Sequence, residues 1–320
     1  MAGVPGGLTR RVPARGAARV QSVPSQPDPA ALGAQERPIL LRRLLPPGQP
    51  VTVPETVEEL GLWQRAPGSG DRGRMLVNMV STVDGRATLG GRSAPLSGAA
   101  DREMFHGLRS GMDAVVVGAG TVRMERYGRI IRDDTVRRRR RERGLAEEPL
   151  ACIVSGRLAL DPDIPLLAEP QARVVIVTSS PASLPPTAAH VEYVRAERDG
   201  RVDLGAALSE LRSRFGVQVM LCEGGPHLTL QLFAAGLVDE LFLSLSPRLA
   251  GGEAATGESL RILAGAELDP PLALELLGAL ECESDLFLRY GVSDGDRISA
   301  PRPSPAPAAG PAPASGEGSG

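Results

Sequence analysis

The sequence predicts an α/β fold: a mostly parallel central sheet with helices on both faces and an antiparallel C-terminal edge. The first observation is that strand-like apolar runs alternate with helix-like runs through the middle of the chain. The second is that the last three strand-like runs, at 240–246, 272–280 and 285–291, have no helix between them. Alternation with helices is typical of parallel strands, and direct succession is typical of antiparallel ones.

The main domain begins with a strand-like run at 75–80. A helix is predicted at 100–109, because Met104, Phe105 and Leu108 form one apolar face. A helix at 204–215 leads into a strand at 217–222, and the helix after that strand ends at Gly236, a residue type that favours helix C-termini. Between these helices the apolar runs predict strands at 114–118, 150–154, 173–178 and 190–194.

Composition divides the 320 residues into four segments. Residues 1–36 are rich in Pro, Gly and Ala and lack the apolar core of a secretory signal, so we expect a disordered N-terminal tail. Residues 37–73 are expected to pack on the main domain as a leader that contains a short helix. The main domain spans 74–292, and the Pro-, Ala-, Ser- and Gly-rich segment 293–320 is expected to be disordered.

Charge and cysteine content narrow the class of protein. The formal net charge of −2 gives no general attraction to nucleic acid or to an anionic membrane. We find no segment long and apolar enough to span a membrane. Cys152, Cys222 and Cys282 lie far apart, which indicates neither a disulfide framework nor a metal site, and a reducing cytoplasm is the expected setting.

An arginine run occupies 137–143, interrupted only by Glu142. Such a run is most often a solvated loop or helix end, and we favour that interpretation. A binding surface for an acidic partner is the alternative.

The segment 221–228, Leu-Cys-Glu-Gly-Gly-Pro-His-Leu, carries the strongest functional signal. Glu223 closes the strand, Gly224 and Gly225 form a turn, and Pro226 stands at the first position of a helix. A glycine turn that opens a helix leaves backbone N–H groups free to hold a phosphate. The alternative is an ordinary strand–turn–helix corner.

A second glycine turn follows the strand at 114–118, where Gly118 and Gly120 form a G-x-G pattern. A dinucleotide fingerprint needs a third glycine at the position that Arg123 occupies. It also needs an acidic residue about twenty positions later, where the arginine run lies instead. A standard Rossmann site for NAD is therefore disfavoured, and a different nucleotide-binding sheet with two glycine turns is favoured.

A third candidate feature follows the strand predicted at 75–80. There, Asp84 is followed by Gly85 and Arg86. A carboxylate beside a cation at a strand end is suited to act on a substrate. It is equally suited to cap a turn, because Asp-Gly is common turn chemistry.

Together these segments resemble one family. The motifs S-x-V-D-G-R-A, L-S-G-x-A-D-R, V-V-V-G-A-G-T-V-R-x-E and C-E-G-G-P-x-L, in that order, resemble the riboflavin-pathway pyrimidine reductases. Those proteins are the reductase half of bacterial bifunctional deaminase-reductases and have a dihydrofolate-reductase-like fold. The resemblance covers roughly 74–292 and is closest to a stand-alone form. The zinc deaminase half is missing, since H-x-E with P-C-x-x-C does not occur.

The resemblance implies NADPH-dependent reduction of a ribosylaminopyrimidine phosphate, with a hydride passing to C1 of the sugar and no metal required. It implies a homodimer as the common assembly. Ser155 and Arg157 follow the strand at 150–154 and suit the 2′-phosphate of NADPH, since arginine offers forked donors to phosphate oxygens. The rest of the cofactor site would be Gly118, Gly120, Thr121, Gly224, Gly225, Pro226 and His227.

On the substrate side, the resemblance places Asp84 and Glu223 near the reacting centre as candidate catalytic residues. Ser93, Ser97 and Arg102 are the candidate substrate-binding residues, with Arg102 assigned to the substrate phosphate. Arg109 and His106 lie on the same predicted helix as Arg102.

Two departures from the family pattern concern the substrate more than the cofactor. Ser93-Ala94-Pro95 stands where the family has Ser-x-Trp, and Glu125 and Tyr127 stand where it has an Asp-Pro pair. Two alternatives therefore stay open. One is a reductase of the same fold acting on dihydrofolate, another pterin or another small heterocycle. The other is a nucleotide-binding protein without catalytic activity.

Overall fold

The computed structural model describes residues 38–65, 73–252 and 260–292. The expected disordered tails, 1–36 and 293–320, lie outside the described residues. The described chain is built around an 11-stranded sheet, in the order β2-β1-β12-β13-β11-β3-β10-β4-β5-β6-β7.

The strands from β11 to β7 are parallel, and the strands from β11 to β2 alternate in direction. The predicted mostly parallel sheet with an antiparallel C-terminal edge is therefore confirmed. The parallel strands are β11 (Glu240–Ser246), β3 (Arg74–Thr82), β10 (Val219–Cys222), β4 (Ala114–Gly118), β5 (Leu150–Val154), β6 (Arg173–Thr178) and β7 (His190–Arg195). The antiparallel ones are β13 (Asp285–Val292), β12 (Leu274–Cys282), β1 (Leu40–Leu45) and β2 (Val51–Thr52), and β8 (Glu197–Arg198) with β9 (Arg201–Val202) forms a separate small hairpin.

The helices begin and end where local chemistry favours it. Helix α5 (Leu204–Phe215) is capped by the Asp203 side chain and ends at Gly216 with φ of 70°. Helix α6 (Pro226–Ala234) has its proline in the first turn. The other helical elements are α1 (Val53–Glu59), η1 (Ala94–Leu96), α2 (Ala99–Ser110), α3 (Ala119–Met124) and α4 (Asp134–Glu142).

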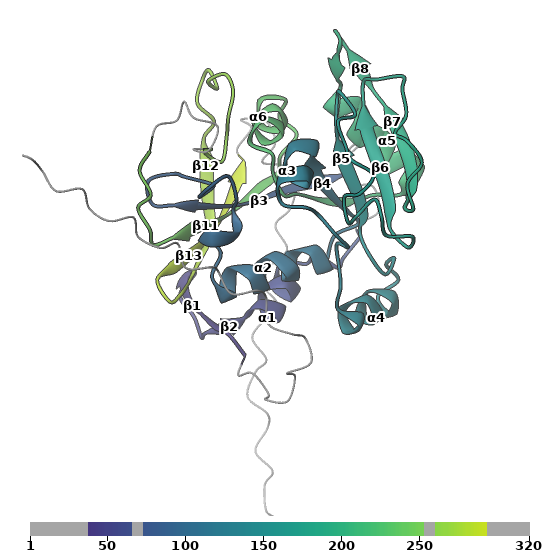
Figure 1. Cartoon of the computed structure of the whole chain (residues 1–320). Helices are drawn as coiled ribbons and strands as arrows, with labels where there is room; N and C mark the ends of the chain where they lie inside the picture. Colours follow the sequence, from purple (N-terminus) through teal and green to yellow (C-terminus); the bar gives the residue numbers. More distant parts are fainter. Residues whose placement is uncertain (1–37, 66–72, 253–259, 293–320) are drawn as a thin grey trace, which may run out of the picture. The chain divides into compact units, whose positions relative to one another are not determined.

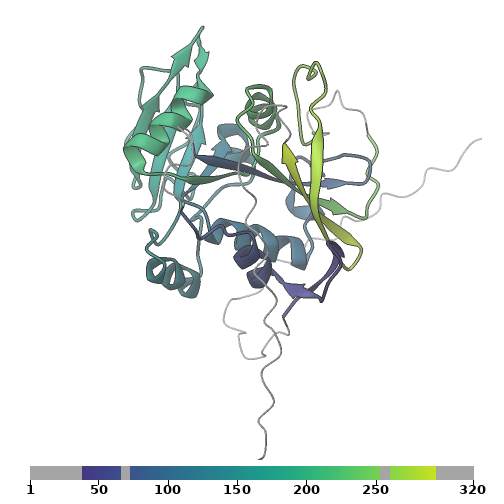
Figure 2. The same ribbon diagram turned by 180° about the vertical axis from the view of Figure 1, so that it is seen from behind.

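Successive residues of the strands point to opposite faces of the sheet and pack into a hydrophobic core on each face. Met75, Val116 and Met220 belong to a cluster that α5 and α6 cover. Their strand neighbours belong to clusters covered by α1 and α2 in one part and by α3 in another. Figures 1 and 2 show these helices distributed over both faces, as the sequence predicts.

The leader extends the sheet. Its strand β1 pairs antiparallel with β12, with Arg42 opposite Glu281, and its helix α1 is capped by a reciprocal bond pair between Thr52 and Glu55. Val53 and Val57 of α1 join the core beneath α2. The sequence suggests a leader that packs on the domain, but strand pairing with the C-terminal edge is not apparent from it.

The arginine run forms much of α4, and one of its arginines is buried in the protein. Arg140 is fully buried, and its guanidinium donates to the carbonyl oxygens of Ser110, Met112 and Ala146 at 2.7–2.8 Å. Arg139 and Arg143 stack on Trp63 of the leader, at 5.4 and 4.4 Å from the ring centre. The interpretation as a solvated segment holds for the exposed Arg138 and is wrong for Arg140, because a carbonyl cluster from other segments buries that side chain.

Candidate active site

The two glycine turns meet at the carboxyl ends of neighbouring strands. Strand β10 pairs with β4 in parallel, and the amide of Gly118 donates to the carbonyl of Gly224 at 3.0 Å. A Cβ placed on Gly225 would lie 3.4 Å from Cα of Gly118 and 3.5 Å from Oγ1 of Thr121. Gly224 and Gly225 have φ of 98° and 84°, a region that favours glycine. The sequence predicts two phosphate-holding turns, and the fold brings them together into one glycine-lined edge.

This edge presents free backbone donors. Helices α3 and α6 both begin here, at Gly118 and Gly225, and neither has a side-chain cap. A Cβ on Gly120 would meet nothing within 4 Å, so the first turn of α3 faces open space. The side chain of Thr121 lies against Gly225, and the exposed His227 follows in the first turn of α6. Uncapped helix starts with room in front of them suit the phosphates of a nucleotide.

The loop after β5 borders the same edge. Ser155 is buried and its amide donates to Val177 of β6 at 2.9 Å, whereas Arg157 is exposed. Arg123, at the end of α3, reaches this loop and donates to the carbonyl of Ala159 at 2.5 Å. Two guanidinium groups therefore lie at or near the loop where the sequence places the 2′-phosphate.

Glu223 is held by a buried ion pair. Nε and Nη2 of Arg109, on α2, donate to its two carboxylate oxygens at 2.6 Å each, and the side chains are 8% and 1% exposed. The hydroxyl of Tyr127 donates to Oε2 of Glu223 at 2.8 Å. The guanidinium of Arg109 also stacks over Phe105 at 4.1 Å from the ring centre. Glu223 is thus anchored between α2 and the segment that follows α3.

The charges in this cluster reinforce each other. Burial alone would lower the pKa of Arg109, but the neighbouring Glu223 carboxylate outweighs it and raises that pKa. Burial of the Tyr127 hydroxyl, together with the negative charge of Glu223, raises the pKa of Tyr127 well above its ordinary value. At neutral pH Arg109 is therefore charged and the phenol of Tyr127 is neutral.

Asp84 fixes a loop rather than projecting freely. Its carboxylate accepts hydrogen bonds from the hydroxyl of Thr82 and from the amides of Ala250 and Gly251, the last at 2.6 Å. These bonds, the one from Thr82 first, lower the pKa of Asp84 to about 2. The turn after β3 is thereby tied to the segment that follows β11.

The candidate substrate-binding residues lie along the segment between this turn and α2. Ser93 donates through its amide and its hydroxyl to Glu125 at 2.9 and 3.0 Å. Arg102 is exposed, and its guanidinium donates to the carbonyl of Ser97 at 2.7 Å. Glu125 and Tyr127, which stand where the family has an Asp-Pro pair, are therefore both engaged with candidate site residues.

Arg132 is a candidate that the sequence analysis did not single out. Partial burial of the His106 ring lowers the pKa of His106, and the charges of Arg109, Arg132 and Arg102 lower it further, against an opposing effect of Glu223. The charges of three arginines therefore act on His106, and two of them, Arg102 and Arg109, lie on the same helix as that histidine. Arg132 is distant from them in the sequence, so no local motif indicates it.

Within the described ranges, no group of three or more His, Cys, Asp or Glu side chains could hold a metal ion. The three cysteines are free thiols, and Cys152 and Cys222 are buried. No helix in the part of the chain that the structure describes could cross a membrane.

The model of the RibD C-terminal domain family matches residues 74–288. The chain belongs to this family. The resemblance stated from the sequence is therefore confirmed. The RibD C-terminal domain accounts for every strand of the sheet except β1 and β2, with β13 truncated at its end.

Curated relatives of this RibD C-terminal domain include a reductase and a riboflavin biosynthesis protein by name. The 2,5-diamino-6-ribosylamino-4(3H)-pyrimidinone 5′-phosphate reductase of Methanothermobacter thermautotrophicus is 27% identical over 226 residues, which cover 68% of this chain and 97% of that protein. The riboflavin biosynthesis protein RibD of Synechocystis is 30% identical over 178 residues, which cover 54% of this chain and 45% of that protein.

A solved structure shows the same fold. A pyrimidine reductase-like protein from Corynebacterium diphtheriae superposes with a TM-score of 0.59 at 22% identity, covering 76% of this chain and all of that one (100%). The architecture described above is thus shared within the family.

Proposed function

We propose that this chain is an NADPH-dependent reductase that acts on a ribosylaminopyrimidine phosphate in riboflavin biosynthesis. The observation that carries the proposal is the meeting of the two glycine turns at adjacent strand ends, in a chain of the RibD C-terminal domain family. The names of the curated relatives supply the substrate class.

The residues fit a nicotinamide dinucleotide. Gly120 and Thr121 on one side and Gly225 and His227 on the other offer backbone N–H groups for the pyrophosphate, with open space before Gly120. Gly118, Gly224 and Pro226 shape the two turns. Ser155 and Arg157, supported by Arg123, would take the 2′-phosphate that distinguishes NADPH from NADH. When bound, NADPH supplies the hydride, and the protein binds, orients and adjusts the local charge.

The two candidate catalytic carboxylates, Glu223 and Asp84, would hold other parts of the site in place. We assign Glu223 to holding Arg109 and Tyr127 beside the glycine-lined edge, since both of its oxygens accept hydrogen bonds there. Asp84 serves the substrate side by fixing the loop after β3 against Ala250 and Gly251. Either carboxylate reaches the reacting centre only if a substrate displaces part of these contacts.

Substrate binding is assigned to the segment before α2 and to its outer face. Ser93 and Ser97 line the approach, and the exposed Arg102, with Arg132 near the same His106 ring, would hold the substrate phosphate. Hydrogen bonds from a guanidinium to a phosphate are stronger than hydrogen bonds between neutral groups.

A turnover assay tests the proposal. The full chain is incubated with NADPH and with either a ribosylaminopyrimidine phosphate or dihydrofolate, and oxidation of NADPH is followed. Faster turnover of the pyrimidine supports the proposal. Faster turnover of dihydrofolate supports the pterin alternative, which the absence of the family tryptophan at Pro95 favours. Binding of NADPH without turnover of either would identify a nucleotide-binding protein.

We propose a homodimer in a reducing cytoplasm as the working form. The free state of all three cysteines supports the setting. Size-exclusion chromatography with light scattering tests the assembly, and a monomer at micromolar concentration would contradict it.

A further inference from the structure

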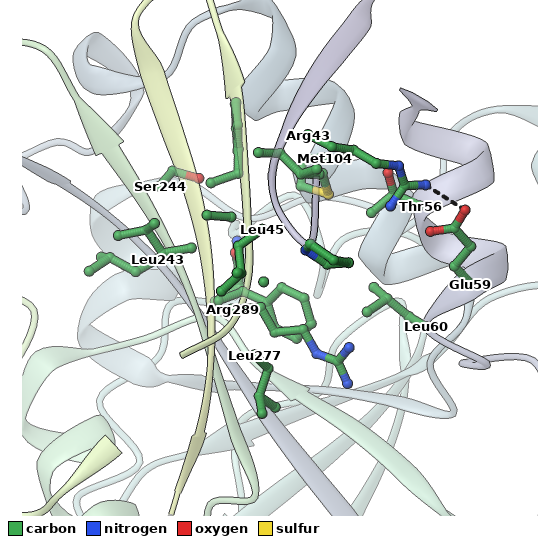
Figure 3. A pocket seen from close by; sticks show the side chains of 18 residues that line it. Arg43, Leu45, Thr56, Glu59, Leu60, Met104, Leu243, Ser244, Leu277 and Arg289 are labelled. Atoms are coloured by element: carbon green, nitrogen blue, oxygen red, sulfur yellow. Dashed lines mark hydrogen bonds and ion pairs between the residues drawn. The ribbon is translucent and has the colours of Figure 1, made fainter. Parts of the chain in front are cut away.

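A cavity of about 220 Å³ lies between the leader and the C-terminal part of the sheet. Figure 3 shows side chains from the leader on one side, including Thr56 and Glu59 of α1 and Leu60 directly after it, and Leu277 of β12 and Arg289 of β13 on the other. None of the candidate active-site residues lines it. The cavity is therefore a feature of the leader's contact with the sheet, separate from the glycine-lined edge.

The walls of the cavity are mostly apolar. Leu45 and Leu60 from the leader, Met104 from α2, and Phe242, Leu277 and Phe287 from the sheet contribute to them. The volume exceeds the roughly 150 Å³ of a cavity that binds benzene and falls below the roughly 300 Å³ at which drug-sized sites begin. One aromatic ring or a fused pair is the size of ligand that such a space accepts.

Two guanidinium groups line the cavity and keep free donors. Arg43 donates through Nε to Gln49 and through Nη2 to Glu59 at 2.5 Å, and Arg289 donates through Nε to Glu240 at 2.6 Å. The hydrogen bonds that these two side chains make to described residues leave Nη1 of Arg43 and both terminal nitrogens of Arg289 for another acceptor. Ser244, also in the lining and only 5% exposed, makes no side-chain hydrogen bond within the described ranges.

The balance of charge at the cavity favours an anion. Glu240 is shared between Arg289 and Arg74, and Glu59 pairs with Arg43. Among the residues that line the cavity, the two guanidinium groups exceed the one carboxylate, Glu59, by one positive charge. A planar carboxylate on an apolar ring matches the forked donors of arginine.

We propose that this cavity binds a small aromatic monocarboxylate, with its ring among the apolar walls and its carboxylate at Nη1 of Arg43. Such a ligand bridges the leader and the sheet, and it stabilises their contact by binding only when both are folded together.

The probe is 2-naphthoate, compared with 2-naphthamide, which has nearly the same shape and no charge. Binding to the full chain is measured by calorimetry. We expect a dissociation constant of about 0.1–1 mM for 2-naphthoate, the range reached by good ligands of this size. The amide should bind at least about fivefold more weakly, since it lacks the charge-assisted contacts.

Variants with matched controls locate the site. Arg43→Gln should weaken 2-naphthoate about fivefold or more and leave the amide unchanged. Arg42→Gln is the control, because Arg42 lies on the same strand in an exposed ion pair with Glu281 and does not line the cavity. Leu60→Trp fills the cavity and should abolish binding of both probes, whereas Leu40→Trp, at an exposed position of β1, should leave both unchanged.

Three results would overturn the proposal. They are the absence of 2-naphthoate binding at 10 mM or so, equal affinity for the acid and the amide, and undiminished binding in a folded Leu60→Trp variant. Far-ultraviolet circular dichroism of the same samples serves as the check on folding, so the outcome does not depend on the proposed reductase activity.

Discussion

Arg109 and Glu223 form a bidentate ion pair, although 114 residues separate them in the sequence. Arg109 is the penultimate residue of α2, and Glu223 directly follows β10, so the pair links a helix to the strand end that opens the glycine turn. Because the tyrosine hydroxyl of residue 127 bonds the same carboxylate, the contact also orders the segment after α3. A buried ion pair, as well as apolar packing, therefore holds the candidate active site in place.

Removing one partner of this pair is expected to be costly. Arg109→Met leaves the Glu223 carboxylate buried without its cation, and we expect a loss of about 3–5 kcal/mol in the free energy of unfolding. Urea titration followed by circular dichroism measures it. The double variant with Glu223→Gln should lose less than the sum of the single changes. Arg214→Met, at a surface pair with Glu192, is the control and should cost under about 1 kcal/mol. Strict additivity of the two changes would show that the pair does not couple.

The stability of the fold should depend on Asp84 at low pH. Hydrogen bonds from Thr82, Gly251 and Ala250 lower its pKa to about 2 from the ordinary 3.8, so the folded state favours the ionised form. The stabilisation is present above about pH 4 and is lost as the pH falls toward about 2. Melting temperatures between these values should fall more steeply for the wild type than for Asp84→Asn. Asp199→Asn, at an exposed turn, serves as the control. Parallel curves for the wild type and Asp84→Asn would show that the carboxylate makes no net contribution.

Gly120→Ala tests whether the cofactor occupies the space before α3. Added to the free protein, the methyl group meets nothing within 4 Å, so the fold should persist. If a phosphate lies there, affinity for NADPH should fall by about tenfold, equivalent to about 1.4 kcal/mol. Gly205→Ala changes the same second position of α5 and should leave NADPH affinity unchanged. Calorimetry on the three proteins decides, and an unaltered affinity in Gly120→Ala would place the cofactor elsewhere.

Arg157→Ala tests the choice between NADPH and NADH. A charge-assisted contact to phosphate contributes roughly 1.5–3 kcal/mol, so affinity for NADPH should fall about ten- to a hundredfold. Binding of NADH, which lacks that phosphate, should be unchanged. The measured quantity is the ratio of kcat/KM for the two cofactors in the wild type and the variant. A preference that survives the change would transfer the role to Arg123, whose guanidinium reaches the same loop.

Two neighbouring arginines of α4 should behave differently. Arg140→Met leaves the carbonyl oxygens of Ser110, Met112 and Ala146 without their donor and should destabilise the protein by about 1–3 kcal/mol. Arg138→Met, at an exposed position of the same helix, should change stability by less than about 0.5 kcal/mol. If the two variants change the thermal unfolding temperature equally, the hydrogen bonds of Arg140 do not stabilise the protein and the whole run behaves as a solvated segment.

Local pattern was sufficient to predict the parallel strands and both glycine turns. The boundaries of β4, β5 and β6 agree with the apolar runs that predict them, because strands buried on both faces are continuous apolar segments. The strand–glycine–glycine–proline order likewise predicts the start of α6, since each residue there has one favoured place.

Contacts between distant segments could not be read in the same way. The bond from Tyr127 to Glu223 and the burial of Arg140 depend on which segments the sheet order brings together. Nothing in the spacing of apolar residues specifies that order. The sequence therefore predicts where Asp84 and Glu223 lie along their strands, but not which groups already occupy their oxygens.

The pairing of β1 with β12 has a consequence for biosynthesis. Arg42 and Glu281 are 239 residues apart, so a ribosome moving at about 5–20 residues per second needs roughly 10–50 s to deliver the partner of β1. During that interval β1 has an open edge, and a nascent chain must keep it from pairing with another copy. A protein that stops before β12 never closes this edge, so premature termination before residue 274 should yield aggregates rather than a shortened, folded domain.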